Sequence, residues 1–126
     1  MAIHKILIVD DSPTERYYLT DILVKQGFAV STAVSGEEAL VTMRADRPEL
    51  ILMDVVMPGA NGFQVTRSIA RDPELAAIPV IICSSKNQET DRIWGMRQGA
   101  KDYFVKPVDP AQMLARIAAL AANDAG

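Results

Sequence analysis

Short apolar segments and longer segments of mixed polarity alternate along the whole chain. Five apolar segments, the second and last of them weaker, occupy residues 6–9, 28–33, 50–53, 80–83 and 103–105. Runs this short, rich in Ile and Val, favour strands that are buried on both faces. Stretches with a helical pattern follow each of them, at about 13–26, 36–46, 63–72, 88–98 and 110–121. The pattern predicts a doubly wound α/β fold, (βα)5, with five parallel strands and helices on both faces.

Residues typical of helix ends support these boundaries. Ser12 is followed by Pro13 and, three residues after the serine, by Glu15, which is the spacing of a capping box. Ser35 begins a second segment of this kind, and an Asp-Pro pair at 109–110 precedes the last helix. Glycines at 27 and 99 follow two of the helical segments, where a left-handed residue commonly ends a helix.

Length and composition indicate one globular domain. The chain has 126 residues, of which 49% are hydrophobic and 23% charged, so it is too apolar for a disordered protein. We expect a single domain over residues 1–121, a short frayed tail over 122–126, and no output domain. No apolar stretch approaches the roughly 20 residues that span a bilayer, and no signal peptide precedes the first strand.

Net charge and cysteine content narrow the range of possible functions and cellular compartments. The formal net charge is −3, which gives no electrostatic footprint for DNA or RNA, so we expect no nucleic-acid partner. Cys83 is the one cysteine and has no partner for an internal disulfide, which suits a reducing cytoplasm. Its position in an apolar run indicates that Cys83 packs in the core as a small hydrophobic residue.

Polar and charged residues follow four of the predicted strands. The first strand ends in Asp10 and Asp11, the third in Asp54, the fourth in Ser84 and the fifth in Lys106. In doubly wound sheets, ligands bind outside the carboxyl ends of the strands. We therefore expect three carboxylates, a hydroxyl group and an ammonium group to meet at one edge of the sheet.

Three neighbouring carboxylates repel one another unless a cation neutralises them. Oxygen ligands with open coordination positions suit Mg²⁺, which keeps several waters and prefers phosphate as a further ligand. We expect Asp11 to be a direct ligand and Asp10 to act mainly through a water molecule. Asp54 is then either a third ligand or a nucleophile that attacks a phosphoryl group, with Lys106 and Ser84 holding phosphoryl oxygens.

Each of these residues also has a simpler interpretation when taken alone. An Asp pair is commonly a solvated helix start, because acids favour a helix N-terminus. An isolated Lys106 is ordinarily a surface lysine, and Tyr103 is commonly a half-buried core aromatic. The metal and phosphoryl interpretation rests on the combination of Asp10, Asp11, Asp54 and Lys106 at matching strand ends.

The order and spacing of these segments resemble the receiver domain of two-component response regulators, of the CheY-like single-domain type. The segments that carry the resemblance are "VDD" at 9–11, "DVVMPGANG" at 54–62, Ser84, "GAKDY" at 99–103 and "KP" at 106–107. The resemblance covers essentially the whole chain. It implies a flavodoxin-like fold with strand order 2-1-3-4-5.

The family resemblance also implies a role for each matching residue. Asp54 is the expected phosphoacceptor, with Lys106 and Ser84 assisting; Ser84 and Tyr103 are the expected switch residues. The expected Mg²⁺ ligands are Asp10, Asp11, Asp54 and the backbone carbonyl of Val56. The Lys106–Pro107 peptide bond is expected to be cis.

The function implied is a phosphorylation-controlled switch. A histidine kinase, CheA-like in a chemosensory pathway, donates the phosphoryl group, and a downstream protein binds a face that includes residues 88–98 and 103–116. When Ser84 moves toward the phosphoryl group, Tyr103 is expected to rotate into the space it leaves. The segments after the acid pair and around the fourth strand resemble PilH-type regulators of twitching motility. The expected state is a monomer.

Two other functions remain open at this point, and the sequence argues against a third. The protein can be a phosphate sink that drains the kinase, or a pseudo-receiver that docks without phosphorylation. Phosphatases of the haloacid dehalogenase kind also use an aspartyl nucleophile, but they need an acid two residues after it. Counting from Asp10, that residue is Ser12, so no general acid is available.

Overall fold

The computed structural model describes the backbone of residues 3–125 and the side chains of residues 3–122. The strands are β1 (Lys5–Val9), β2 (Ala29–Ala33), β3 (Leu50–Met53), β4 (Val80–Ser84) and β5 (Asp102–Val105). The helices are α1 (Pro13–Lys25), α2 (Gly36–Ala45), α3 (Gly62–Arg71), α4 (Glu89–Arg97) and α5 (Pro110–Ala125). Every predicted strand and helix is therefore present.

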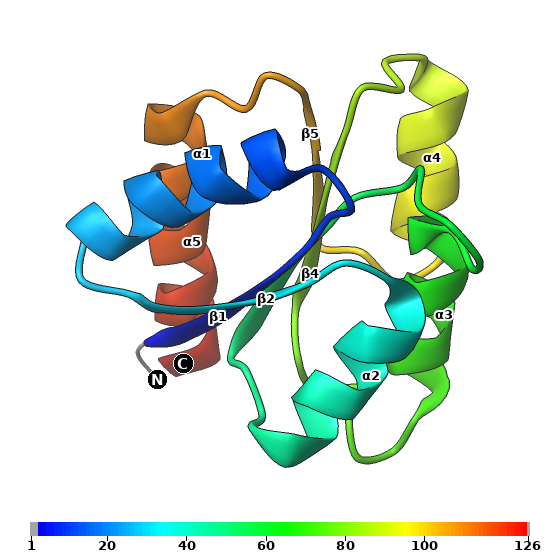
Figure 1. Cartoon of the computed structure of the whole chain (residues 1–126), viewed down its shortest axis with the longest axis horizontal. Helices are drawn as coiled ribbons and strands as arrows, with labels where there is room; N and C mark the ends of the chain where they lie inside the picture. Colours follow the sequence, from blue (N-terminus) through cyan, green and yellow to red (C-terminus); the bar gives the residue numbers. More distant parts are fainter. Residues whose placement is uncertain (1–2, 126) are drawn as a thin grey trace.

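All five strands are parallel and form one sheet in the order β2-β1-β3-β4-β5. Helices α1 and α5 cover one face of this sheet, and α2, α3 and α4 cover the other (Figure 1). This arrangement confirms the predicted doubly wound fold and its strand order. Strand β1 lies at the centre of the order reversal, between β2 and β3, where such folds place their ligands.

Alternate residues of the strands supply two separate cores. The core beneath α1 and α5 includes Ile6 and Ile8 of β1, whereas Leu7 and Val9 contribute to the core beneath α2 and α3. All four of these side chains have no exposed surface. Because both faces of the strand are covered, β1 reads in sequence as a continuous apolar run rather than an alternating one.

The sheet's hydrogen bonds extend one residue beyond three of its strands. The backbone N–H of Asp10 donates to the last carbonyl of β2 at 3.0 Å, and that of Asp54 donates to the last carbonyl of β1 at 2.9 Å. The N–H of Lys106 donates in the same way to the last carbonyl of β4 at 2.8 Å. These bonds fix the backbone of three charged residues at the carboxyl edge of the sheet.

Helix ends follow the residues expected from the sequence. The Ser12 hydroxyl accepts a hydrogen bond from the Glu15 N–H at 3.3 Å and caps α1. Gly27 and Gly99 adopt φ values of 93° and 112°, which confirms the predicted left-handed positions. Helix α3 has a reciprocal capping box between Asn61 and Gln64.

The end of the last helix differs from the prediction. Helix α5 continues to Ala125, so residues 122–125, which were expected to form a frayed tail, are helical. The segment is rich in alanine, which has the highest helix propensity, and this favours continuation of the helix. Gly126 lies outside the described residues. No helix among residues 3–125 is long and apolar enough to cross a membrane.

Gly62 at the start of α3 allows the backbone after β3 to fold tightly. A Cβ atom at this position would lie 1.9 Å from the carbonyl oxygen of Asp54 and 2.9 Å from the Cα of Val55. The Gly62 N–H donates to the Val55 carbonyl at 2.9 Å. The absence of a side chain therefore lets α3 begin directly against the residue that follows β3.

We predict that Gly62→Ala lowers the free energy of unfolding by more than Gly27→Ala, measured by urea denaturation. At Gly27 a Cβ would meet nothing within 4 Å. Alanine there should therefore lower the free energy of unfolding only by the cost of its left-handed backbone conformation, about 1–2 kcal/mol. At Gly62 the added methyl group meets backbone atoms that cannot rotate away, and overpacking adds about 1–3 kcal/mol or more. Equal losses for the two variants would contradict this account of Gly62.

Candidate functional site

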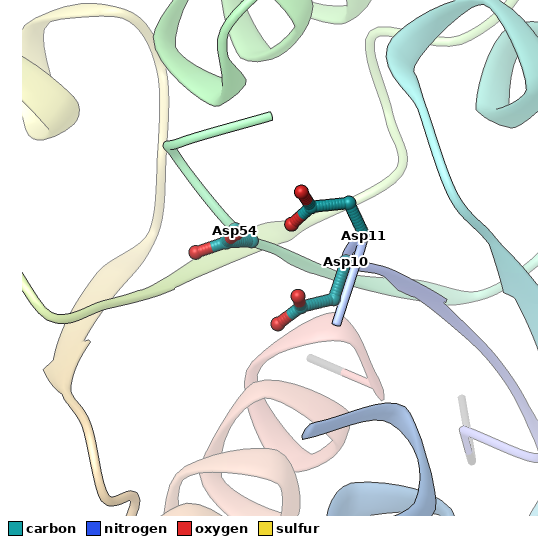
Figure 2. A group of neighbouring side chains, drawn as sticks. All are labelled: Asp10, Asp11 and Asp54. Carbon is teal, nitrogen blue, oxygen red and sulfur yellow. The ribbon is translucent and has the colours of Figure 1, made fainter. Parts of the chain in front are cut away.

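Three carboxylates gather at the adjoining ends of β1 and β3. Asp10, Asp11 and Asp54 each place a carboxylate oxygen within 4.8 Å of the others. Figure 2 shows the three carboxyl groups at these two strand ends. Asp10 and Asp54 are buried, with 2% and 7% of their surface exposed, whereas Asp11 is exposed. The predicted acidic cluster is therefore present, and it opens to solvent on the side of Asp11.

The Lys106 ammonium joins the two buried carboxylates. Its Nζ lies 2.7 Å from Asp10 Oδ2 and 3.1 Å from Asp54 Oδ1. The lysine side chain is itself only 14% exposed, so this ion pair is shielded from water. Lys106 follows β5 and the two acids follow β1 and β3, so residues from three strands meet at one point.

The alternation of side chains along the strands explains this meeting. Two residues before Asp10, Ile8 lies in the core beneath α1 and α5. Leu52, two residues before Asp54, belongs to the same core, and Phe104, two residues before Lys106, packs against it. Because side chains repeat their direction every second residue, all three charged groups point to this face.

Burial raises the pKa of the Asp54 carboxyl group above its usual value, and the nearby charge of Asp10 raises it further. The Lys106 ammonium acts in the opposite direction, through its charge and its hydrogen bond, but offsets these effects only in part. The ionised form of Asp54 is therefore destabilised by its surroundings. An additional cation placed beside this carboxylate would stabilise its ionised form.

The pKa of Lys106 is raised despite burial. Burial alone would lower it, but the hydrogen bond to Asp10 and the charges of Asp54 and Asp10 outweigh that effect. Lys106 therefore remains an ammonium group at neutral pH. Its charge is available to any anionic group that enters the site.

Three carboxylates and one ammonium group leave the cluster with a formal charge of −2 when all are ionised. Oxygen-only ligands, an exposed side at Asp11 and this charge fit a hard divalent cation such as Mg²⁺. Asp10 already accepts hydrogen bonds from Lys106 and from the Ser12 N–H, at 2.7 and 2.9 Å. Its oxygens are thus less free to bind a metal directly than those of Asp11.

Helix α1 contributes two contacts that the sequence analysis missed. Arg16 Nη1 donates to the carbonyl oxygen of Asp10 at 2.8 Å, and the Tyr18 hydroxyl donates to the carbonyl of Val108 at 2.9 Å. One contact holds the loop after β1, and the other holds the loop that follows Lys106. Both acceptors are backbone carbonyls, which carry no recognisable signal in the sequence.

Ser84 and Tyr103 lie toward the opposite face of the sheet. Ser84 has no exposed surface, and its Oγ accepts a hydrogen bond from the Lys86 N–H at 3.1 Å. Tyr103 is 5% exposed and belongs to a small cluster with Phe63 and Ile82. Its hydroxyl donates to the carbonyl of Lys86 at 2.8 Å.

Tyr103 lies inward in this structure, and its expected rotation when Ser84 moves toward a phosphoryl group stays a prediction. Both residues are buried at the same time, because the ring occupies a space beside α4 and its hydroxyl is satisfied by the Lys86 carbonyl. The Lys86 peptide unit therefore links the two side chains, through its N–H to Ser84 and its carbonyl to Tyr103.

Two smaller predictions are confirmed. The Lys106–Pro107 peptide bond is cis. Cys83 is a buried free thiol in the core beneath α1 and α5. Burial raises the pKa of this thiol to about 12, so it stays protonated and unreactive at neutral pH although charged groups lie nearby.

Comparison with known proteins agrees with this geometry. The family model for the response regulator receiver domain matches residues 6–118. The chain is 53% identical over 119 residues to the protein PilH of Pseudomonas aeruginosa, with 94% of this chain and 98% of that protein covered. Other curated relatives at 36–41% identity are longer, and the chain spans 26–52% of their length.

Solved structures show the same fold. The signal receiver domain of a histidine kinase from Syntrophus aciditrophicus matches with a TM-score of 0.88 and 32% identity, covering 95% of this chain and 91% of that one. Vibrio cholerae chemotaxis protein CheY4 matches with a TM-score of 0.86 and 29% identity, covering 94% and 98%. Because the family model covers most of the chain and PilH is similar over nearly its whole length, the chain belongs to the response regulator receiver domain family.

Proposed function

We propose that the protein is a phosphorylation-controlled switch whose phosphoacceptor is Asp54. The observation that carries this proposal is the Lys106 ammonium, which lies between the buried carboxylates of Asp10 and Asp54 with Asp11 beside them. An acceptor needs an ionised oxygen next to a cation that can take up negative charge as the phosphoryl group arrives. Asp54 has both, and family membership supports the same role.

The transfer step is a displacement at phosphorus. An Asp54 carboxylate oxygen attacks the phosphoryl group of a phosphohistidine in the kinase, and the phosphorus–nitrogen bond breaks as the new phosphorus–oxygen bond forms. The imidazole keeps the electron pair of the broken bond. Lys106 then exchanges its contact with Asp54 for one with a phosphoryl oxygen, which needs little movement because Nζ is already 3.1 Å from Asp54 Oδ1.

The residues that would hold Mg²⁺ are Asp11 and Asp54 directly, Asp10 through water, and the backbone carbonyl of Val56. When bound, the ion supplies positive charge that neutralises the cluster and the phosphoryl oxygens. The protein's own contribution is to keep the three carboxylates together before the ion arrives. Two kinds of interaction do this: the backbone hydrogen bonds of Asp10 and Asp54 to the neighbouring strands, and the ion pair of both carboxylates with Lys106.

The signal then leaves the site through the loop between β4 and α4. The Ser84 hydroxyl is the group at this strand end that can donate to a phosphoryl oxygen, and its movement would release the Lys86 N–H. Because Tyr103 holds the carbonyl of the same residue, the loop and the tyrosine respond together. The output surface that we propose includes residues 88–98 and 103–116.

Exposed apolar side chains on α4 and β5 support this choice of surface. Ile93, Trp94, Met96 and Val105 are between 38% and 48% exposed. Exposed apolar groups that cluster on neighbouring elements are typical of protein-binding surfaces. A downstream protein that recognises this surface would detect a change in α4.

The pathway that we propose is a chemosensory one of the PilH type that controls twitching motility, with a CheA-like histidine kinase as donor in the cytoplasm. The support is the 53% identity to PilH, which extends over nearly the whole length of both proteins. We propose that the protein acts as a monomer. A role as a phosphate sink would use the same chemistry at Asp54 and would need no downstream partner.

We predict that Asp54→Asn abolishes phosphorylation, because an amide oxygen does not attack phosphorus. Wild-type protein incubated with a small acyl-phosphate donor and Mg²⁺ should gain the mass of one phosphoryl group, and Asp54→Asn should gain none. Ser84→Ala and Ser85→Ala serve as controls and should still be phosphorylated. A phosphoryl group mapped by peptide mass spectrometry to Ser84, Ser85 or His4 would refute the assignment.

Mg²⁺ affinity should depend more on Asp11 than on Asp10. We predict that Asp11→Ala weakens binding by about tenfold or more, since even outer partners of metal ligands contribute about 10–100-fold. Asp10→Ala should have a smaller effect, because that carboxylate is engaged by Lys106 and Ser12. Asp21→Ala on the exposed side of α1 is the control. Isothermal titration calorimetry checks the order, and unchanged affinity in Asp11→Ala would contradict it.

The raised pKa of Asp54 predicts how stability changes with pH. A carboxyl group whose pKa is higher in the folded state favours folding while it is protonated, and this contribution is lost as pH rises through that pKa. In a chelator at pH 7, Asp54→Asn should therefore be more stable than wild type in urea denaturation. The difference should shrink as pH falls below the folded-state pKa of Asp54, and saturating Mg²⁺ should favour wild type.

Asp72 provides a control of opposite sign. The Glu74 N–H and the Arg44 guanidinium lower the pKa of the Asp72 carboxyl group, so its ionised form favours folding above its unfolded-state pKa. Asp72→Asn should therefore destabilise the protein at pH 7. If both Asn variants change stability in the same direction, the proposed charge imbalance at Asp54 is wrong.

A further inference from the structure

Helix α4 contacts the rest of the domain at a glycine. Gly95 is the one buried residue among Glu89–Arg97, and its neighbours Trp94 and Met96 are 48% and 38% exposed. A glycine inside a helix costs about 1 kcal/mol relative to alanine. An alanine here would strengthen the helix, so the space that glycine leaves must serve the packing of α4 against its neighbours.

That space is filled by three side chains from other elements. A Cβ atom on Gly95 would lie 2.8 Å from Ile82 Cδ1, 3.1 Å from Tyr103 Cδ2 and 3.3 Å from Phe63 Cε1. The tyrosine contact is the notable one, because the ring is held inward with its hydroxyl on the Lys86 carbonyl. The backbone of α4 thus lies directly against the edge of this ring.

We propose that Gly95 is a positioning residue that permits the inward state of Tyr103 and so sets how strongly α4 responds to events at Asp54. This inference rests on the proposed switch function and adds the residue that controls its balance. A methyl group at 95 must displace either the ring or the helix. Either movement separates α4 from the hydrogen-bonded chain that runs from Ser84 through Lys86 to Tyr103.

The position of Tyr103 can be measured without phosphorylation. The chain has three tyrosines, and Tyr17 and Tyr18 are 77% and 37% exposed against 5% for Tyr103. Fluorotyrosine incorporated at these positions gives resonances whose sensitivity to H₂O and D₂O reports exposure. The Tyr103 resonance is assigned by its loss in Tyr103→Phe. Wild-type protein should show one shielded resonance and two exposed ones.

In Gly95→Ala we expect the solvent sensitivity of the Tyr103 resonance to rise at least threefold. The Trp94 fluorescence change on addition of beryllofluoride and Mg²⁺ should fall at least threefold. The rate of Asp54 phosphorylation by a small acyl-phosphate donor should stay within twofold of wild type, because the residues that a methyl group at 95 would meet do not belong to the acidic cluster. Met96→Ala, which removes an exposed side chain from the same helix, should leave all three quantities unchanged.

The double variant Gly95→Ala with Ile82→Val separates the two closest contacts. Valine lacks the Cδ1 atom that lies 2.8 Å from the added methyl group, so this variant relieves the tightest clash and keeps the tyrosine contact. It also covers the case in which Gly95→Ala alone does not fold. We expect the double variant to keep the exposed Tyr103 resonance and the reduced Trp94 response.

Two outcomes would overturn the proposal. One is a Tyr103 resonance that stays shielded in every folded alanine variant at 95. The other is full restoration of the wild-type behaviour by Ile82→Val, which would assign the effect to Ile82 packing. Failure of wild-type protein to become phosphorylated at Asp54 would instead refute the proposed function, and the tyrosine measurement would still report whether Gly95 controls the ring.

Discussion

The ion pair of Lys106 with Asp10 and Asp54 is the interaction on which the site depends. It joins the ends of β1, β3 and β5, and all three side chains are largely buried. Removal of Lys106 is expected to cost about 3–5 kcal/mol, because it leaves buried charges unpaired. Removing the lysine would leave two buried carboxylates facing each other. The Lys106 ammonium group therefore allows the fold to keep two carboxylates, those of Asp10 and Asp54, buried at the ends of β1 and β3.

The same constraint makes the site responsive. Lys106 offsets only part of the negative charge, so the pKa of Asp54 remains raised and the cluster favours additional positive charge. A divalent cation would satisfy this preference, and the phosphoryl group that we propose for Asp54 would change the balance again by adding negative charge beside Lys106. On the other face of the sheet, Ser84, the Lys86 peptide unit and Tyr103 form a chain of hydrogen bonds. We propose that this chain carries a change at Asp54 to α4.

Much of this arrangement could be predicted from the sequence, because local patterns determine it. Apolar runs located the strands, and the carboxyl ends of parallel strands must share an edge, so Asp10, Asp54 and Lys106 were expected together. The contacts of Arg16 and Tyr18 could not be predicted, since they end on backbone carbonyls, one of them 90 residues away. The inward ring of Tyr103 depends on the missing side chain of Gly95, and that dependence appears only when α4 is placed against β5. The extension of α5 was missed because the small residues of 122–125 suit both a helix and a disordered tail.

The central claim is that Asp54 carries a negative charge that Lys106 does not fully compensate. The most direct test is a pH titration of the Asp54 carboxyl carbon by ¹³C NMR, first in a chelator and then with saturating Mg²⁺. The account predicts a midpoint above the usual aspartate value of about 3.9 in the chelator, and a lower midpoint with Mg²⁺. A midpoint at or below the usual value without metal, or one that Mg²⁺ does not move, would contradict it.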